Sequence, residues 1–193
     1  MFLHNLEQYE IILASKSPRR QQLLSDLGLK FTVQSMDVKE DFPDGLGMTE
    51  IPVFLAELKA NAFLPQMKDN QLVITADTIV WLDGKVMGKP KDYSDGFKML
   101  SDLSGKKHEV VTGVCLLSKT KKIVFYTISD VWFKNLSEDE IHYYLENYKP
   151  YDKAGAYGIQ EWIGYVGVNR IEGSFFNVMG LPIQDLYEHL KNF

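Results

Sequence analysis

Residues 71–82, QLVITADTIVWL, form an almost unbroken apolar run that decides the fold. The run is rich in β-branched residues and has the length of a strand, so it predicts a buried strand with one acid, Asp77, inside it. The dipeptide Asp83-Gly84 comes next and is typical of a hairpin turn. We therefore expect residues 85–88 to return antiparallel beside the run.

Strand-like and helix-like patterns alternate on both sides of this run. Ser17-Pro18 predicts a helix start with Ser as N-cap and Pro in the first turn, and Gly28 predicts its end. Ser137 and Glu140 have the spacing of a capping box. The other predicted helices begin near Thr49, at Ser94 and near residue 181, and the other predicted strands are 10–14, 29–36, 108–118, 122–133 and 163–171. Hairpins beside helical crossovers indicate an α/β chain with a mixed sheet.

Length and composition limit the class of protein. The 193 residues suffice for one domain, or for two lobes that share a sheet. The net charge is −5, which argues against broad binding to nucleic acid or acidic membranes, because phosphate backbones need a basic face. Neither a signal peptide nor an apolar run near 18 residues is seen, so we expect a cytoplasmic protein. The one cysteine, Cys115, lies in an apolar run and is interpreted as a buried thiol.

Asp77 is the first candidate for chemistry. A carboxylate inside an apolar strand is costly unless it is paired, hydrogen-bonded or bound to a metal. The alternative is a structural Asp bonded to a neighbouring turn. Flanking threonines and the nearby Lys89 favour the functional interpretation.

The segment 13–20, LASKSPRR, is the second candidate. A helix N-terminus offers free N–H groups and a partial positive charge, and Arg19 and Arg20 add cations in the first turn. Small residues such as Ser15 let a ligand approach the backbone closely. This pattern predicts a phosphate site, although a capped helix with solvated arginines fits the spacing equally well.

Three further positions are weaker candidates when each is taken alone. Lys89 follows Gly88 in a stiff loop, and Lys59 adjoins the apolar stripe of a predicted helix, but solvated lysines explain both. Gln160 ends the glycine-containing segment 151–160, and its amide has a donor and an acceptor that suit the edge of a base. A surface loop is the alternative there. The four histidines show no mutual ligand spacing, and neither GxxxxGK[ST] nor GxGxxG occurs.

Taken together, the chain resembles the Maf family of septum-formation-like proteins. The matching segments occur in the family's order and span nearly the whole chain: LASKSPRR (13–20), LAELKANA (55–62), ITADTIV (74–80), GKP (88–90), HEVVTGVCL (108–116), YDKAGAYGIQ (151–160) and IEGSFFNVMGLP (171–182). Each segment is modest alone, but their joint occurrence is specific.

The resemblance implies one Maf-like domain over residues 1–193: an elongated mixed β-sheet flanked by helices, in two lobes with a central cleft, resembling inosine-triphosphate pyrophosphatases. It implies hydrolysis of nucleoside triphosphates to the monophosphate and pyrophosphate, a divalent metal (Mg²⁺ or Mn²⁺) as cofactor, and a homodimer. Asp77 matches the family's proton acceptor and metal ligand, and Glu40 is the best match to its metal-binding glutamate, although Lys39 stands where the family often has an acid. The predicted substrate-binding residues are Ser15, Arg19, Arg20, Lys59, Thr78, Lys89 and Gln160.

Within the family, Arg19, Thr78 and Gln160 match the subgroup that acts on dTTP and UTP. The implied function is therefore removal of these, or of modified pyrimidine triphosphates, in a house-cleaning role. Two alternatives stay open: a nucleotide-binding regulator of cell division with little turnover, and an enzyme for methylated purine triphosphates.

Overall fold

The structure is a computed structural model that describes residues 3–193. Its strands are β1 (Glu10–Leu13), β2 (Thr32–Val33), β3 (Gln71–Leu82), β4 (Lys85–Met87), β5 (Lys107–Leu117), β6 (Lys122–Phe133) and β7 (Val168–Glu172). Its α-helices are α1 (Pro18–Asp26), α2 (Glu50–Asn61), α3 (Tyr93–Leu103), α4 (Glu138–Tyr148), α5 (Trp162–Gly167), α6 (Phe175–Met179) and α7 (Ile183–Lys191). Short 3-10 turns lie at His4–Leu6, Leu64–Gln66 and Ala154–Ala156.

Within residues 3–193 the strands form a seven-stranded sheet in the order β2-β1-β3-β5-β6-β7, with β4 paired to β3. β1 is parallel to both β2 and β3, whereas the β3–β4 and β6–β7 pairs are antiparallel. The predicted class, an α/β protein whose mixed sheet is flanked by helices, is confirmed. The central run 71–82 is the strand β3 with the predicted bounds.

The chain divides into two compact units. The first contains residues up to Asp77, 112–127 and 180–193, and the second contains 78–111 and 128–179. The boundary falls inside β3, between Asp77 and Thr78, so the two neighbours in the sequence belong to different units. This division does not test the prediction of one domain with two lobes.

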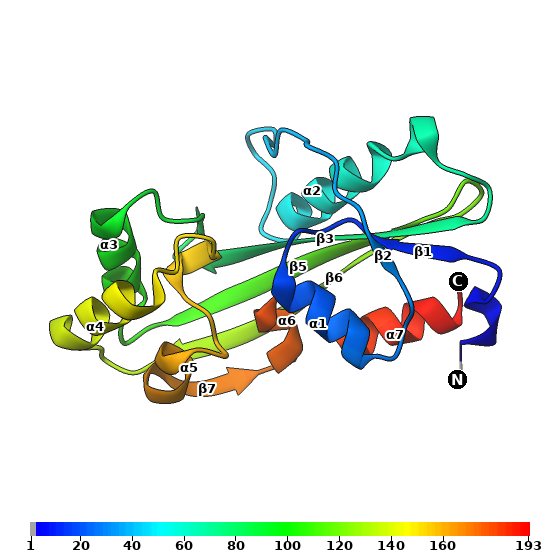
Figure 1. The fold of residues 1–193 in the computed structure, drawn as a ribbon. Helices are drawn as coiled ribbons and strands as arrows, with labels where there is room; N and C mark the ends of the chain where they lie inside the picture. The colour runs from blue at the N-terminus through cyan, green and yellow to red at the C-terminus, as the bar shows by residue number, and fades with distance from the viewer. Residues whose placement is uncertain (1–2) are drawn as a thin grey trace. The chain divides into compact units, whose positions relative to one another are not determined.

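In the first unit, helices lie on both sides of the strands. α2 covers one side of β1 and β3, while α1 and α7 lie on the other (Figure 1). Under α2 the strands and the helix share an apolar cluster that includes Ile12, Ala56, Ala60 and Val73. The helix comes this close because Gly113 of β5 has no side chain: a Cβ there would lie 2.4 Å from the carbonyl carbon and oxygen of Pro52.

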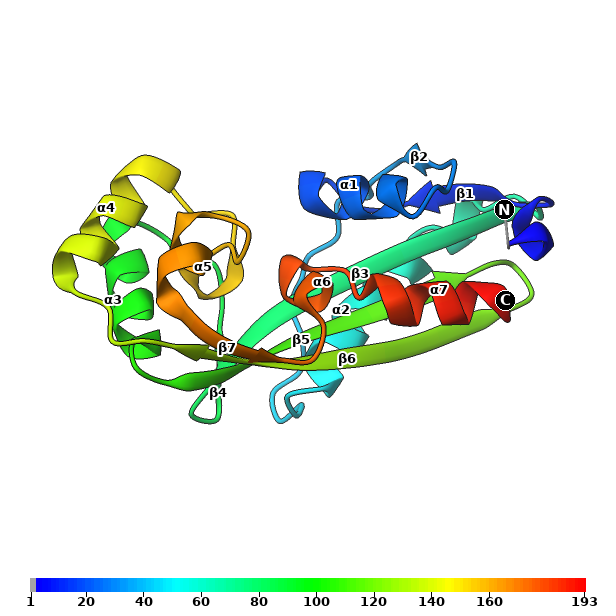
Figure 2. The ribbon, with the colours of Figure 1, turned by 90° about the horizontal axis from the view of Figure 1, so that it is seen from below.

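In the second unit, α3 and α4 pack side by side (Figure 2). They share an apolar cluster with the strand ends and with the segment before α5; among its members are Leu100, Leu103, Tyr144, Leu145 and Ile159. Burial of each large side chain of this kind contributes about 1.5–3 kcal/mol to folding. The segment 151–160 is thus built into a core rather than attached as a surface loop.

The predicted helix N-caps are confirmed only in part. Ser17 caps α1 with Pro in the first turn, and Ser137 and Glu140 form the capping box of α4, both as predicted. The predicted cap at Ser94 is wrong, since Asp92 caps α3 by accepting from the backbone N–H of Asp95. Thr49 precedes α2 but makes no side-chain cap bond.

Two predicted strands were too long. Of residues 29–36 only Thr32–Val33 pair, with Ile12 and Leu13 of β1. Of residues 163–171, the first part is the helix α5, and the strand β7 begins at Val168.

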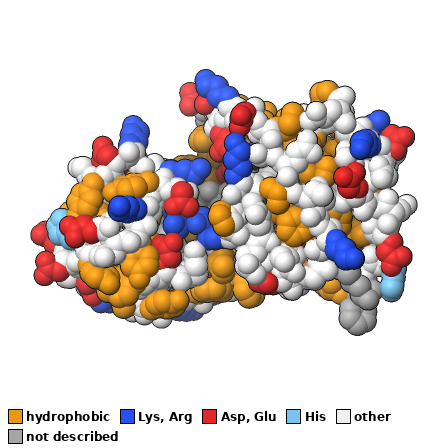
Figure 3. All heavy atoms as spheres, viewed as in Figure 1, with side chains coloured by type: hydrophobic (Ala, Val, Ile, Leu, Met, Phe, Trp, Pro, Cys, Tyr) orange, Lys and Arg blue, Asp and Glu red, His pale blue; other side chains and the backbone are white. Residues whose placement is uncertain are grey.

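The surface is mixed in charge. On the face shown in Figure 3, acidic and basic side chains lie interspersed among apolar ones. Among the helices of residues 3–193, not one has both the length and the apolar character needed to cross a membrane.

Candidate active site

The turn after β1 is built by its small residues. Ser15 is buried, and its Oγ accepts a hydrogen bond from the backbone N–H of Ser17 at 3.2 Å. The Oγ of Ser17 in turn accepts from the N–H of Arg20, which starts α1. Gln21 donates from its side chain to the carbonyl of Ser15 at 3.2 Å. The result is a rigid helix start with Arg19 and Arg20 in its first turn.

Arg20 is directed inward rather than toward solvent. Its Nε donates to the carbonyl of Gly180 at 2.7 Å, and its Nη1 donates to the carbonyl of Ala76 at 2.8 Å. Burial lowers the pKa of Arg20, and the charge of Asp77 opposes that shift. The guanidinium therefore braces the strand at the residue immediately before Asp77. Its predicted contact with substrate remains a prediction.

Asp77 is mostly buried in β3 and meets a cation from α2. Lys59 Nζ lies 2.5 Å from Asp77 Oδ1 and 3.1 Å from Glu40 Oε1. The side chains of Lys59 and Asp77 are only 16% and 12% exposed, so solvent screens their attraction weakly. Lys59 lies in the last turn of α2, where the helix dipole favours a cation. Three predicted site residues, distant in sequence, thus form one cluster.

This cluster fits a divalent cation. Asp77 and Glu40 direct carboxylate oxygens at one positive group, and carboxylates are the ligands that Mg²⁺ and Mn²⁺ prefer. No group of three or more acidic, His or Cys ligands occurs in residues 3–193, so water and substrate oxygens would complete the shell. Mg²⁺ commonly keeps several waters and binds through one or two carboxylates plus substrate phosphates.

The remaining predicted residues, Thr78, Lys89 and Gln160, belong to the second unit. Lys89 is exposed, in a loop held by the bond from the Gly155 N–H to the Gly88 carbonyl at 3.0 Å. Gly155 has φ +67, and a Cβ there would press on Val80. The loops 88–90 and 151–160 are therefore joined.

Gln160 has an unusual side chain. Its Oε1 is buried, and no atom of residues 3–193 donates a hydrogen bond to it. A buried amide oxygen without a donor is costly, and such atoms call for an explanation. An incoming N–H group from a ligand would satisfy it.

The sequence analysis gave no individual role to Tyr144, Glu161 or Lys153, whose side chains form one set of contacts next to Gln160. Lys153 Nζ lies 3.0 Å from Glu161 Oε1, and the Tyr144 hydroxyl donates to Glu161 Oε2. In the sequence, Tyr144 occupies the apolar stripe of α4 beside Ile141 and Leu145, so it looks like ordinary core. Only the tertiary structure reveals its hydroxyl contacts.

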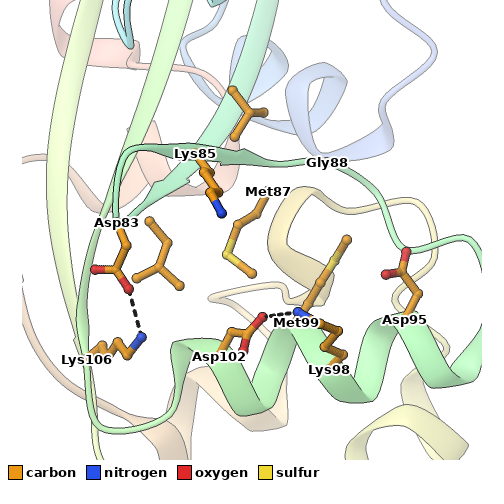
Figure 4. A pocket seen from close by; sticks show the side chains of 11 residues that line it. Asp83, Lys85, Met87, Gly88, Asp95, Lys98, Met99, Asp102 and Lys106 are labelled. Carbon is orange, nitrogen blue, oxygen red and sulfur yellow. Dashed lines mark hydrogen bonds and ion pairs between the residues drawn. The ribbon is translucent and has the colours of Figure 1, made fainter.

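A separate hollow of about 440 Å³ lies in the second unit beside β4 and α3 (Figure 4). Its lysines are largely neutralised: Lys98 pairs with Asp102 at 2.7 Å, and Lys106 pairs with Asp83 at 2.8 Å. Of the predicted motifs, only Gly88 reaches it. The hollow is therefore not the predicted site.

Fold and cluster define an α/β protein with a lysine-paired strand carboxylate beside a capped, arginine-bearing helix start. The sequence pattern of the family described as Maf-like protein matches residues 10–193. The chain belongs to the Maf family.

Relatives match over the full length. The dTTP/UTP pyrophosphatase of Parabacteroides distasonis is 54% identical over 192 residues, covering 99% of this chain and 100% of the relative. That of Phocaeicola vulgatus is 55% identical over 190 residues, covering 98% of each. A solved Staphylococcus aureus Ham1 structure aligns with a TM-score of 0.44 at 18% identity, over 64% of this chain and 71% of that one.

Proposed function

We propose that this chain hydrolyses dTTP and UTP to the monophosphate and pyrophosphate. Two relatives with that name match it over nearly their full length at more than half identity. The structural observation that supports the proposal is the Asp77–Lys59–Glu40 cluster, which concentrates charge where a triphosphate and a cation would meet. A protein that only bound nucleotide would not need a carboxylate held this way, so the regulator of cell division is the less favoured alternative.

In the proposed mechanism Asp77 is the general base. It accepts a proton from water while the water oxygen attacks the α-phosphorus. The bond from that phosphorus to the oxygen bridging the β-phosphorus breaks, and pyrophosphate leaves with the electron pair. Arg20 holds the strand beside Asp77 in place through Ala76, so the base is rigid during the proton transfer.

We assign binding of the phosphate groups to two lysines and to the turn that starts α1. Lys59 and Lys89 are proposed to offset the charge that grows on the leaving pyrophosphate, and the Ser15–Arg19 turn to bind phosphate oxygens. Mg²⁺ or Mn²⁺, held by Asp77 and Glu40, would supply further charge neutralisation as a Lewis acid.

Selection of the base is assigned to Gln160, with Thr78 and Arg19. The imide edge of uracil or thymine presents one N–H donor between two carbonyl acceptors. The buried, unsatisfied Oε1 of Gln160 suits that N–H, and its amide N–H suits a neighbouring carbonyl. Pyrimidine triphosphates with a modified ring but an intact imide edge are substrates on the same argument, which fits a house-cleaning role.

We further propose a cytoplasmic location and a homodimer. A reduced compartment agrees with a lone, buried cysteine whose pKa is raised by burial to about 12. Sedimentation velocity on the purified chain tests the homodimer, which a single monomer-sized species would exclude.

The decisive experiment is a triphosphate panel run in H₂¹⁸O with and without Mg²⁺. We expect dTTP and UTP to give the monophosphate and pyrophosphate, with ¹⁸O in the monophosphate. Label in the pyrophosphate would contradict attack at the α-phosphorus. Preferred turnover of a methylated purine triphosphate would contradict the substrate assignment, and tight binding without turnover would support the regulator.

A further inference from the structure

Gln160 is presented by a tight four-residue turn. The backbone N–H of Glu161 donates to the carbonyl of Gly158 at 2.9 Å and closes the turn, with Gln160 as its third residue. The hydroxyl of Tyr165 donates to the carbonyl of Gln160 at 3.0 Å. These bonds fix the backbone of Gln160 but leave its side-chain oxygen unsatisfied.

One hydroxyl group bridges the two ends of this turn. Tyr144, on α4, is fully buried, and its OH accepts from the backbone N–H of Gly158 at 3.0 Å. The same OH donates to Glu161 Oε2. Burial and the adjacent Glu161 raise the pKa of Tyr144, so the hydroxyl keeps its proton and remains the donor. The first and fourth residues of the turn are therefore tied to one point on α4.

The other carboxylate oxygen of Glu161 is also engaged. Lys153 Nζ lies 3.0 Å from Glu161 Oε1 and 2.7 Å from Asp152 Oδ1. The side chain of Lys153 is only 9% exposed, so this ion pair lies largely out of water. Glu161 is thus held from both sides, by a phenol and by an ammonium group.

Crowding leaves the turn little freedom. A Cβ at Gly158 would lie 2.9 Å from the carboxyl carbon of Glu161 and 3.0 Å from Cε of Lys153. A Cβ at Gly164, in α5, would lie 1.8 Å from the carbonyl oxygen of Ile159. Gly164 is needed for the turn to pack against α5, because backbone atoms cannot move aside, whereas a side chain at Gly158 would displace the ends of Glu161 and Lys153.

We propose that Tyr144 is a positioning residue for base selection, whose hydroxyl holds the turn 158–161 so that the amide of Gln160 meets the imide edge of the pyrimidine. The inference rests on the proposed function, because it requires that Gln160 contacts the base. Tyr144 itself touches no substrate in this scheme; it acts through the turn. Without its hydroxyl, the Gly158 N–H and one oxygen of Glu161 lose their partner, and the turn samples other conformations.

The test is Tyr144→Phe, which removes only the hydroxyl. The readout is the ratio of kcat/KM for dTTP to kcat/KM for dCTP, whose base edge carries an amine in place of one carbonyl. We expect this ratio to fall at least about tenfold, through a higher KM for dTTP with little change in kcat. Tyr148→Phe is the matched control: it lies on the same helix with its ring stacked on Tyr144 at 5.1 Å, and it should keep the wild-type ratio.

A double mutant separates positioning from general destabilisation. In a Gln160→Ala background, Tyr144→Phe should lower the ratio no further, because coupled residues are non-additive. A ratio unchanged within about twofold in folded Tyr144→Phe, or an additive fall in the double mutant, would overturn the inference.

A second variant covers the case in which Tyr144→Phe does not fold. Glu161→Gln keeps the shape of the acceptor but removes its charge, and we expect it to lower the same ratio; an unchanged ratio would overturn the inference. Wild-type protein that releases no pyrophosphate from dTTP would instead refute the proposed function, so the two failures are distinguishable.

Discussion

Lys59 Nζ lies 2.5 Å from Asp77 Oδ1, although the two residues come from different elements, the end of α2 and the middle of β3. The same ammonium group lies 3.1 Å from Glu40 Oε1. In the ligand-free protein two carboxylates therefore balance Lys59, and its proposed contact with phosphate requires that a bound triphosphate replace at least one of them. A bound triphosphate and its metal ion would compete for these ion-pair partners. The role of each carboxylate can therefore be tested by a substitution that removes its charge.

Replacement of Asp77 by Asn should abolish most turnover while the fold persists. The amide cannot accept the proton of the attacking water, and loss of a general base typically costs about 10²–10⁴ in rate. Stability should change little because Lys59 keeps Glu40 as a partner. Steady-state pyrophosphate release and thermal unfolding measure the two effects.

The matched control is Asp102→Asn, whose carboxylate pairs with Lys98 in α3 and should keep wild-type activity. Wild-type rates in Asp77→Asn would refute the role of Asp77.

Replacement of Glu40 by Gln should weaken binding of the metal ion, because it removes one of the two proposed carboxylate ligands. We expect the Mg²⁺ concentration for half-maximal activity to rise about tenfold or more, because a neutral amide is a poorer ligand for a hard dication than a carboxylate. Full removal of divalent metal by a chelator should stop wild-type turnover, and added Mg²⁺ or Mn²⁺ should restore it.

Asp41→Asn serves as the control, because that neighbouring acid is 68% exposed and pairs with Lys39. If Asp41→Asn shifts the Mg²⁺ requirement and Glu40→Gln does not, the glutamate assignment is wrong. Turnover that survives the chelator would remove the metal from the proposal.

Replacement of Gly113 by Ala should destabilise the first unit. The new Cβ would lie 2.4 Å from Pro52 C and O and 2.5 Å from Val53 N, and backbone atoms cannot move aside as a flexible side chain can. Overpacking of this kind costs about 1–3 kcal/mol, which lowers Tm by roughly 2–4 °C per kcal/mol in a chain of this size.

Gly88→Ala offers the comparison, because a Cβ there meets nothing within 4 Å and the backbone φ is ordinary. Differential scanning calorimetry of both variants decides the point: equal Tm values would show that α2 can shift away from β5 at little cost.

The sequence predicted features that depend on local chemistry. The bounds of β3, the Ser17 cap with Pro18 and the capping box at Ser137 follow from residue type and spacing alone. Asp77 stood out because an acid in an apolar strand needs a partner. Its actual partner, Lys59, could be proposed for the site but not paired with it, because only the tertiary fold brings α2 onto β3.

The errors arose where tertiary contacts override local pattern. The segment 162–167 is rich in residues that favour strands, yet it forms the helix α5, in which Gly164 packs close against the carbonyl of Ile159. For Arg20, the sequence did not show that its Nε and Nη1 donate to the backbone carbonyls of Gly180 and Ala76, while its predicted contact with phosphate stays a prediction. The spacing of residues along the sequence does not determine the direction in which a side chain points in the folded protein.

His108 should make the fold sensitive to acid. It is fully buried among the rings of Phe133 and Tyr157, with Nε2 2.8 Å from the Tyr157 hydroxyl, and burial lowers its pKa from 6.5 to about 4. Between pH 6.5 and pH 4 the unfolded chain binds the proton and the folded chain does not, so stability is full above pH 6.5 and falls as the pH drops toward 4. Below pH 4 both states are protonated and His108 adds no further loss.

Urea unfolding should show that this residue contributes roughly 2 kcal/mol of the stability lost between pH 7 and pH 5. In His108→Gln, which keeps a polar partner for Tyr157 but does not titrate, that part of the loss should vanish, whereas His4→Gln, at an exposed site, should lose as much as wild type. An equal loss in His108→Gln and wild type would place the acid sensitivity in other groups.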